Sequence, residues 1–81
     1  MRVTVAFFAA MRDAAGTPEE SVELPDGTTV DGLLQELHRV HPTLRALADD
    51  TLVSVNRGLG AVTTVLRDGD AVALFPPLAG G

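Results

Sequence analysis

One amphipathic helix with strand-like segments on both sides is the feature that most constrains how this 81-residue chain can fold. Thr28 or Thr29 can cap the helix, and Pro42 stops or kinks it. One further turn then carries Leu44 and Leu47. A chain of this length supports a single core, so the apolar helix face must cover a sheet built from the other segments. That face consists of residues at helical spacing: Val30, Leu33, Leu34, Leu37 and Val40.

The flanking segments have the alternation or the apolar content of β-strands. In the first, residues 2–10, alternate side chains share one face, and Phe8 points to the opposite side. The core face of this strand consists of Val3, Val5, Phe7 and Ala9. Further strands are predicted at residues 20–24, 52–56, near 61–64 and at 71–75. Their inward side chains are Val22, Leu24, Val53, Val55, Val72 and Leu74.

The order of these elements predicts an α+β fold. A short helix or turn is expected at residues 11–16, and Leu66 fills the core before a turn at residues 67–70. The first and last strands can lie side by side in parallel through a right-handed crossover. One main helix on a mixed four- to five-stranded sheet is the β-grasp, or ubiquitin-like, arrangement. We therefore expect a β-grasp domain over residues 1–75 and a flexible C-terminal Gly-Gly tail over residues 76–81.

Charge and composition exclude several classes of function. The net charge is −5, with six arginines and no lysine, so nucleic acid and anionic membranes are disfavoured as partners. The absence of cysteine rules out disulfides, thiolate metal sites, iron–sulfur clusters and a cysteine nucleophile. We expect no signal peptide and no membrane span, and hence a cytoplasmic location.

The sequence contains no convincing catalytic set. His38 and His41 have a spacing that could bind a metal, but no third ligand is evident, so no metal site is expected. The acidic pairs at residues 49–50 and 68–70 suit turns and lack the ligand spacing of a calcium loop. We therefore expect no bound cofactor and no catalytic activity of the chain alone.

The C-terminal tail has features suited to presenting a carboxylate. Two prolines should direct the chain out of the sheet, because they fix φ and lack a backbone donor. Two glycines without Cβ atoms could thread a narrow channel, and the whole tail could reach about 20 Å at about 3.3 Å per residue. The predicted tail for insertion into a partner is Pro76, Pro77, Leu78, Ala79, Gly80 and Gly81.

A carboxylate at Gly81 would be a poor electrophile until another enzyme activated it, for instance as an acyl-adenylate made from ATP. Sulfur could then replace AMP to give a thiocarboxylate, or a thiol and then a lysine amine could capture the acyl group. The residues alone leave both routes open.

Three apolar side chains are expected near the base of the tail. Phe8 and Phe75 fall on the sheet face away from the helix, on strands that should be neighbours. Leu59 lies in a glycine-flanked segment without an obvious core role. Exposed aromatic and aliphatic groups of this kind mark protein interfaces, so we predict that these three residues contact a partner.

The chain resembles the MoaD family, the small subunits of molybdopterin synthase within the MoaD/ThiS ubiquitin-like sulfur carriers. The resemblance covers the whole length and is most specific at residues 75–81, with the ending Phe-Pro-Pro-Leu-Ala-Gly-Gly. Further matching features are residues 7–9 with Arg12 and Gly16, residues 55–57, and Asp68-Gly69-Asp70. The local sequence Gly58-Leu59-Gly60 is more flexible than is usual for the family.

The resemblance implies a function and a set of partners. A MoeB-like adenylating enzyme would use ATP to activate Gly81, and a sulfur donor protein would supply sulfur for the thiocarboxylate. The tail would insert into a MoaE-like large subunit, and two sulfur transfers to cyclic pyranopterin monophosphate would give molybdopterin, a step of molybdenum cofactor biosynthesis. Phe8, Leu59 and Phe75 match positions where the family packs against its partners. The alternatives are a sulfur carrier for thiamine or cysteine synthesis and a ubiquitin-like covalent protein modifier.

Overall fold

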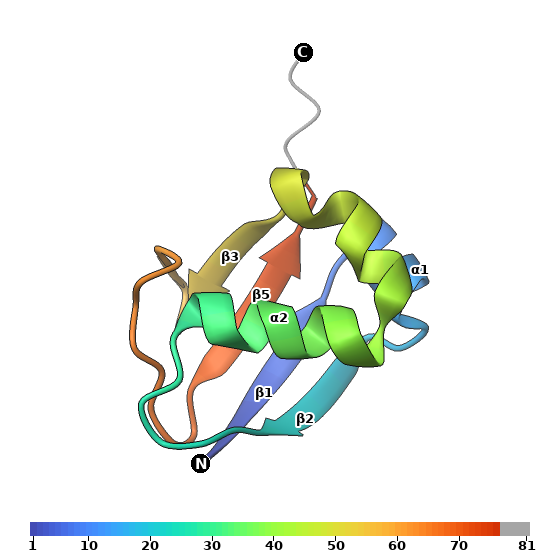
Figure 1. Cartoon of the computed structure of the whole chain (residues 1–81). Coiled ribbons are helices and arrows are strands. Elements are labelled where there is room, and N and C mark those ends of the chain that lie inside the picture. The colour runs from blue at the N-terminus through green and yellow to red at the C-terminus, as the bar shows by residue number, and fades with distance from the viewer. Residues whose placement is uncertain (77–81) are drawn as a thin grey trace.

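The computed structural model describes residues 1–76, which form a five-stranded mixed sheet and three helical segments. The helix α2 (Val30–Val40) crosses one face of the sheet, while α1 (Ala10–Ala15) and the 3₁₀ helix η1 (Pro42–Asp50) pack at the end where β5 finishes (Figure 1). The predicted β-grasp fold is confirmed. The strands are β1 (Arg2–Phe7), β2 (Glu19–Glu23), β3 (Leu52–Val55), β4 (Gly58–Leu59) and β5 (Ala71–Phe75).

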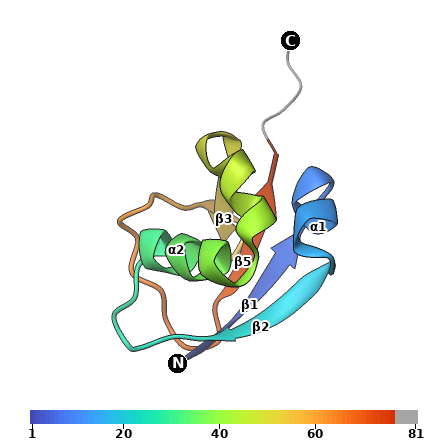
Figure 2. The ribbon, with the colours of Figure 1, turned by 45° about the vertical axis from the view of Figure 1, so that its right-hand side comes forward.

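The sheet has the strand order β2-β1-β5-β3-β4, with the first and last strands at its centre. β1 and β5 run parallel, as the sequence predicts, and in the observed register Val5 lies opposite Val72 and Phe7 opposite Leu74. β2 pairs antiparallel with β1, and β3 pairs antiparallel with β5. The long connection between β2 and β3 carries α2 across one face of the sheet and η1 to its end, and no helix among residues 1–76 covers the other face (Figure 2).

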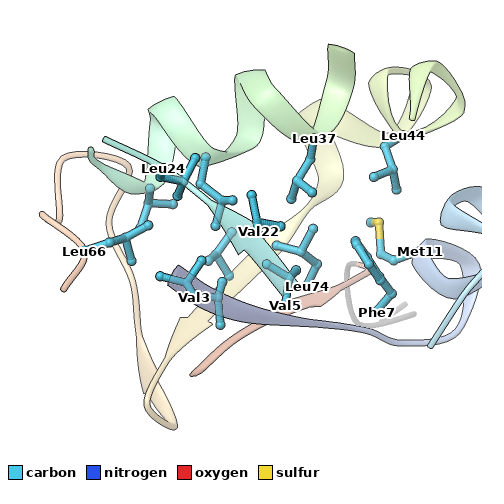
Figure 3. Packing of buried hydrophobic residues seen from close by; sticks show 14 residues of the cluster. Val3, Val5, Phe7, Met11, Val22, Leu24, Leu37, Leu44, Leu66 and Leu74 are labelled. Atoms are coloured by element: carbon cyan, nitrogen blue, oxygen red, sulfur yellow. The ribbon is translucent and has the colours of Figure 1, made fainter. Parts of the chain in front are cut away.

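The core lies between α2 and the sheet and is purely apolar (Figure 3). Thr29 caps α2, since its hydroxyl accepts a hydrogen bond from the backbone N–H of Gly32 at 3.2 Å. Met11 from α1, Leu44 from η1 and Leu66 from the loop before β5 close the ends of the core. Leu44 and Leu66 take the buried positions that the sequence predicts. The remaining buried members are Val3, Val5, Phe7, Val22, Leu24, Val30, Leu33, Leu37, Val53, Val72 and Leu74.

Two predicted core positions are wrong. β1 ends at Phe7 instead of continuing to residue 10, and Ala9 is exposed with φ 49° at the start of α1. The chain must leave the strand direction there to enter the helix, so the alternation stops. Val40 is 48% exposed because α2 ends at this residue, beyond the part of the helix that the sheet covers.

The fourth strand also differs from its predicted position. It covers Gly58–Leu59 instead of residues 61–64, because a two-residue turn at Asn56-Arg57 reverses the chain at once. Residues 61–64 form a turn in which the backbone N–H of Thr64 donates to the carbonyl oxygen of Ala61 at 3.0 Å.

Among residues 1–76, no helix has the length and apolar character needed to cross a membrane. Of the predicted tail, residues 76–81, the described part of the chain includes only Pro76. The predicted insertion residues Pro77, Leu78, Ala79, Gly80 and Gly81 lie outside the described residues, so the division into a domain at 1–75 and a tail stays a prediction.

Candidate functional site

An aromatic pair lies at the base of the predicted tail. The rings of Phe8 and Phe75 are stacked, with centroids 4.7 Å apart and planes 8° from parallel. The backbone N–H of Phe8 donates to the carbonyl oxygen of Leu74 at 3.1 Å, which extends the parallel pairing one residue beyond β1 and brings the rings together. Phe8 is still 45% exposed, and Pro76 follows Phe75 directly. The two phenylalanines are therefore neighbours on the sheet face away from α2, as predicted.

We call this helix-free face the outer face; it consists of the outward side chains of all five strands. Leu52 lies opposite Phe75 in the β3–β5 pairing and is 42% exposed, so it extends the apolar surface beside the aromatic pair. Leu59 is 92% exposed on β4, which is separated from β5 by β3. Leu59 shares a face with Phe8 and Phe75 but lies at the edge of the sheet.

Leu52 is not among the residues that the sequence predicts at the interface. Because the next residue, Val53, points inward, the alternation in residues 52–56 already places Leu52 on the outward side of the strand. Its position beside Phe75 depends on the register between β3 and β5, which the sequence does not give.

A hollow of about 480 Å³ lies at the centre of the outer face. Its floor follows one row across the sheet, where Ala6, Ala73 and Ser54 are paired on adjacent strands. The side chains of Ala6, Ala73 and Ser54 are short, whereas the rings of Phe8 and Phe75 are large and stand at one end of the row. The surface is therefore hollowed over the short side chains. Arg57 is the only ionisable residue among those that line it: Ala6, Phe8, Ser54, Arg57, Ala71, Val72, Ala73 and Phe75.

A side-chain network holds the turn that carries Arg57. The side-chain amide of Asn56 donates to Asp70 Oδ1 at 2.9 Å, and its Oδ1 accepts from the backbone N–H of Ala71 at 2.9 Å. The backbone N–H of Arg67 donates to Asp70 Oδ2 at 2.8 Å. The pKa of Asp70 is lowered, first by the Arg67 N–H and then by the Asn56 amide, since both stabilise the carboxylate. The network joins the β3–β4 turn to the start of β5.

The two histidines lie away from the outer face, at the end of α2 and just after it. His41 Nε2 is 2.9 Å from Glu20 Oε1, and its ring meets Phe7 edge-on with centroids 6.1 Å apart. Across the described part of the chain, no three His, Cys, Asp or Glu side chains are grouped so that they could hold a metal ion. His41 therefore has a structural contact that joins the helix end to β2.

Comparison with known proteins gives consistent results. The model of the ThiS family matches residues 5–81. The molybdopterin synthase sulfur carrier subunit of Mycobacterium tuberculosis is 40% identical over 100% of this chain and 99% of its own length.

Solved structures agree with this comparison. A putative molybdopterin converting factor subunit 1 from Pyrococcus furiosus has a TM-score of 0.90 at 34% identity, covering 96% of this chain and 99% of that one. SAMP1, the small archaeal modifier protein 1 of Haloferax volcanii, has a TM-score of 0.91 at 28% identity and full coverage of both chains. Because the fold, the family match over residues 5–81 and these relatives agree, the chain belongs to the ThiS family, which includes the MoaD-type sulfur carriers that its sequence resembles.

Proposed function

We propose that this chain is the sulfur carrier subunit of a molybdopterin synthase. The observation that carries the proposal is the apolar outer face immediately before Pro76, where Phe8, Leu52 and Phe75 lie together. Exposed apolar groups next to the tail would let a large subunit dock while receiving the following residues in its own active site. The full-length similarity to a molybdopterin synthase sulfur carrier subunit supports this pathway over others.

The chemistry takes place at the carboxylate of Gly81. It attacks the α-phosphorus of ATP on a MoeB-like enzyme, which releases pyrophosphate and gives an acyl-adenylate. A sulfur donor protein then supplies the sulfur that displaces AMP, leaving a terminal thiocarboxylate. On a MoaE-like large subunit this sulfur forms a bond to cyclic pyranopterin monophosphate, and water cleaves the acyl–sulfur bond and returns Gly81 to a carboxylate. Two such transfers complete the dithiolene.

The division of labour follows from the side chains of the described residues. The hollow on the outer face offers apolar contact and one arginine, and its lining residues include no nucleophile paired to a base. The catalytic groups for adenylation and for sulfur transfer therefore belong to the partners. The role of this chain is to carry the acyl group and to present it.

The test is intact mass spectrometry of the chain after incubation with ATP, the MoeB-like enzyme of the same organism and a sulfur source. The expected result is a mass gain that corresponds to one oxygen-for-sulfur exchange, absent when Gly81 is deleted. A Phe8→Ala variant should lose affinity for the large subunit while circular dichroism shows the same fold. Absence of the exchange in an active enzyme mixture would refute the proposal.

A second candidate is a covalent protein modifier, favoured by the close structural similarity to SAMP1. In that case Gly81 would form isopeptide bonds with lysines of target proteins. A tagged chain expressed in its own organism distinguishes the two functions, because a modifier gives covalent conjugates that survive denaturing electrophoresis. A carrier for thiamine or cysteine synthesis would take up sulfur equally well but would not stimulate molybdopterin formation by a MoaE-like subunit.

A further inference from the structure

Arg57 has an unfavourable backbone conformation. Val55 pairs with Gly58, so Asn56 and Arg57 form a two-residue hairpin turn, and their φ angles are 50° and 73°. Turns with two positive φ angles favour Asn followed by Gly, because a Cβ atom is strained there. Asn56 fits this rule, but the glycine is at position 58, one residue after the second turn position, which Arg57 occupies. The chain therefore places an arginine where glycine would be less strained.

Arg57 adds no polar side-chain contact to the described part of the domain. Its side chain is exposed, and it makes no hydrogen bond or salt bridge with any other residue from 1 to 76. Asn56 and Asp70 hold the turn through their own hydrogen bonds, without the guanidinium. A strained residue that does not stabilise its own domain points to a function.

The charges on the outer face are unevenly distributed. Glu19 is paired with Ala6 and Glu23 with Arg2, so both carboxylates lie on β2, at one edge of the sheet. Arg2 also donates to Glu23 at 3.1 Å, so Glu19 is the charge on that side that has no ion-pair partner among residues 1–76. At the other side of the hollow stands Arg57. A partner that covers this face meets a carboxylate at one edge, an apolar middle and a guanidinium near the opposite edge.

We propose that Arg57 binds a carboxylate on the MoaE-like large subunit and so fixes the direction in which the outer face docks. This inference rests on the proposed function, because it takes the outer face as the docking surface. A guanidinium forms paired hydrogen bonds with a carboxylate, and the apolar walls of the hollow would strengthen them once water is excluded. The wrong orientation would place Glu19 against the partner's carboxylate, and like charges there oppose docking.

The test measures binding of the purified MoaE-like subunit from the same organism by isothermal titration calorimetry. Arg57→Gly should weaken binding about tenfold or more, and Arg57→Glu should weaken it further, because a charge pair becomes a repulsion. The same Arg57→Gly change should raise the melting temperature of the free domain by about 2–4 °C, because the left-handed position no longer carries a side chain. Weaker binding by a more stable protein cannot be ascribed to unfolding.

Two control variants separate the possible outcomes. Arg39→Gln removes one positive charge from α2, on the opposite side of the sheet, and should bind like the unmodified chain. Phe8→Ala tests the docking face itself. If Phe8→Ala weakens binding and Arg57→Gly does not, the role of Arg57 is refuted and the proposed function stands. Equal losses for Arg39→Gln and Arg57→Gly would indicate net charge alone and overturn the inference. If the unmodified chain forms no complex, the proposed function fails as well.

Discussion

Replacing Asn56 with alanine should destabilise the domain more than an exposed position usually allows. The change removes the donor to Asp70 Oδ1 and the acceptor for the Ala71 N–H, two bonds of 2.9 Å. Each such bond contributes about 0.5–1 kcal/mol at an exposed site. Alanine must also adopt the φ of 50°, which asparagine tolerates better, at a cost of about 0.5–1 kcal/mol. We expect a total loss of about 2 kcal/mol in the free energy of unfolding.

A matched variant separates the two contributions. Asn56→Gly removes the same hydrogen bonds but accepts the positive φ without strain. We expect it to lose about 1 kcal/mol, so the difference between the two variants measures the backbone term.

The assay is urea unfolding followed by far-UV circular dichroism, since the chain has no tryptophan or tyrosine to report by fluorescence. For a domain of this size the m-value is about 1–1.5 kcal/mol per M, so a loss of about 2 kcal/mol in Asn56→Ala should lower the midpoint by about 1.3–2 M. A loss below about 0.5 kcal/mol would refute the argument, because an ordinary surface substitution has that effect. Equal losses for alanine and glycine would refute the backbone part alone.

Two further predictions follow from the core and the Asp70 carboxylate. Leu33→Ala should lower the free energy of unfolding by about 3 kcal/mol because Leu33 is fully buried. Val40→Ala, at a residue that is 48% exposed, should change it by less than about 0.5 kcal/mol. Chemical denaturation of both variants checks this, and similar losses would contradict the assigned core. Because the pKa of Asp70 is lowered in the folded state, its contribution is present above the unfolded pKa of about 3.9 and disappears as the pH falls through the folded value. Asp70→Asn should therefore be less stable than the unmodified chain at pH 7, and it should lose less stability on acidification below about pH 4. Thermal unfolding of both proteins across the pH range checks this. If the melting temperatures of the two proteins fall in parallel with pH, Asp70 does not have this role.

The candidate site was only partly predictable. Phe8 and Phe75 could be placed together because the alternation fixes which face each residue takes and the crossover rule makes the first and last strands neighbours. Leu52 could not be placed beside them, because its position depends on a strand register set by packing. The special position of Arg57 was equally hidden, since its turn is held by an aspartate that follows Asn56 by fourteen residues.

Local periodicity in the sequence is sufficient to predict most inward side chains of the sheet, most of the apolar stripe of α2, and the order of elements that makes a β-grasp. Tertiary structure decided where β1 stops, where β4 forms and which side chains surround the hollow on the outer face. These features depend on contacts between residues that are far apart in the sequence. Periodicity is a property of neighbouring residues, whereas register and the Asn56–Asp70 hydrogen bond arise only when distant segments meet, and those contacts placed an arginine at the hollow beside the aromatic pair.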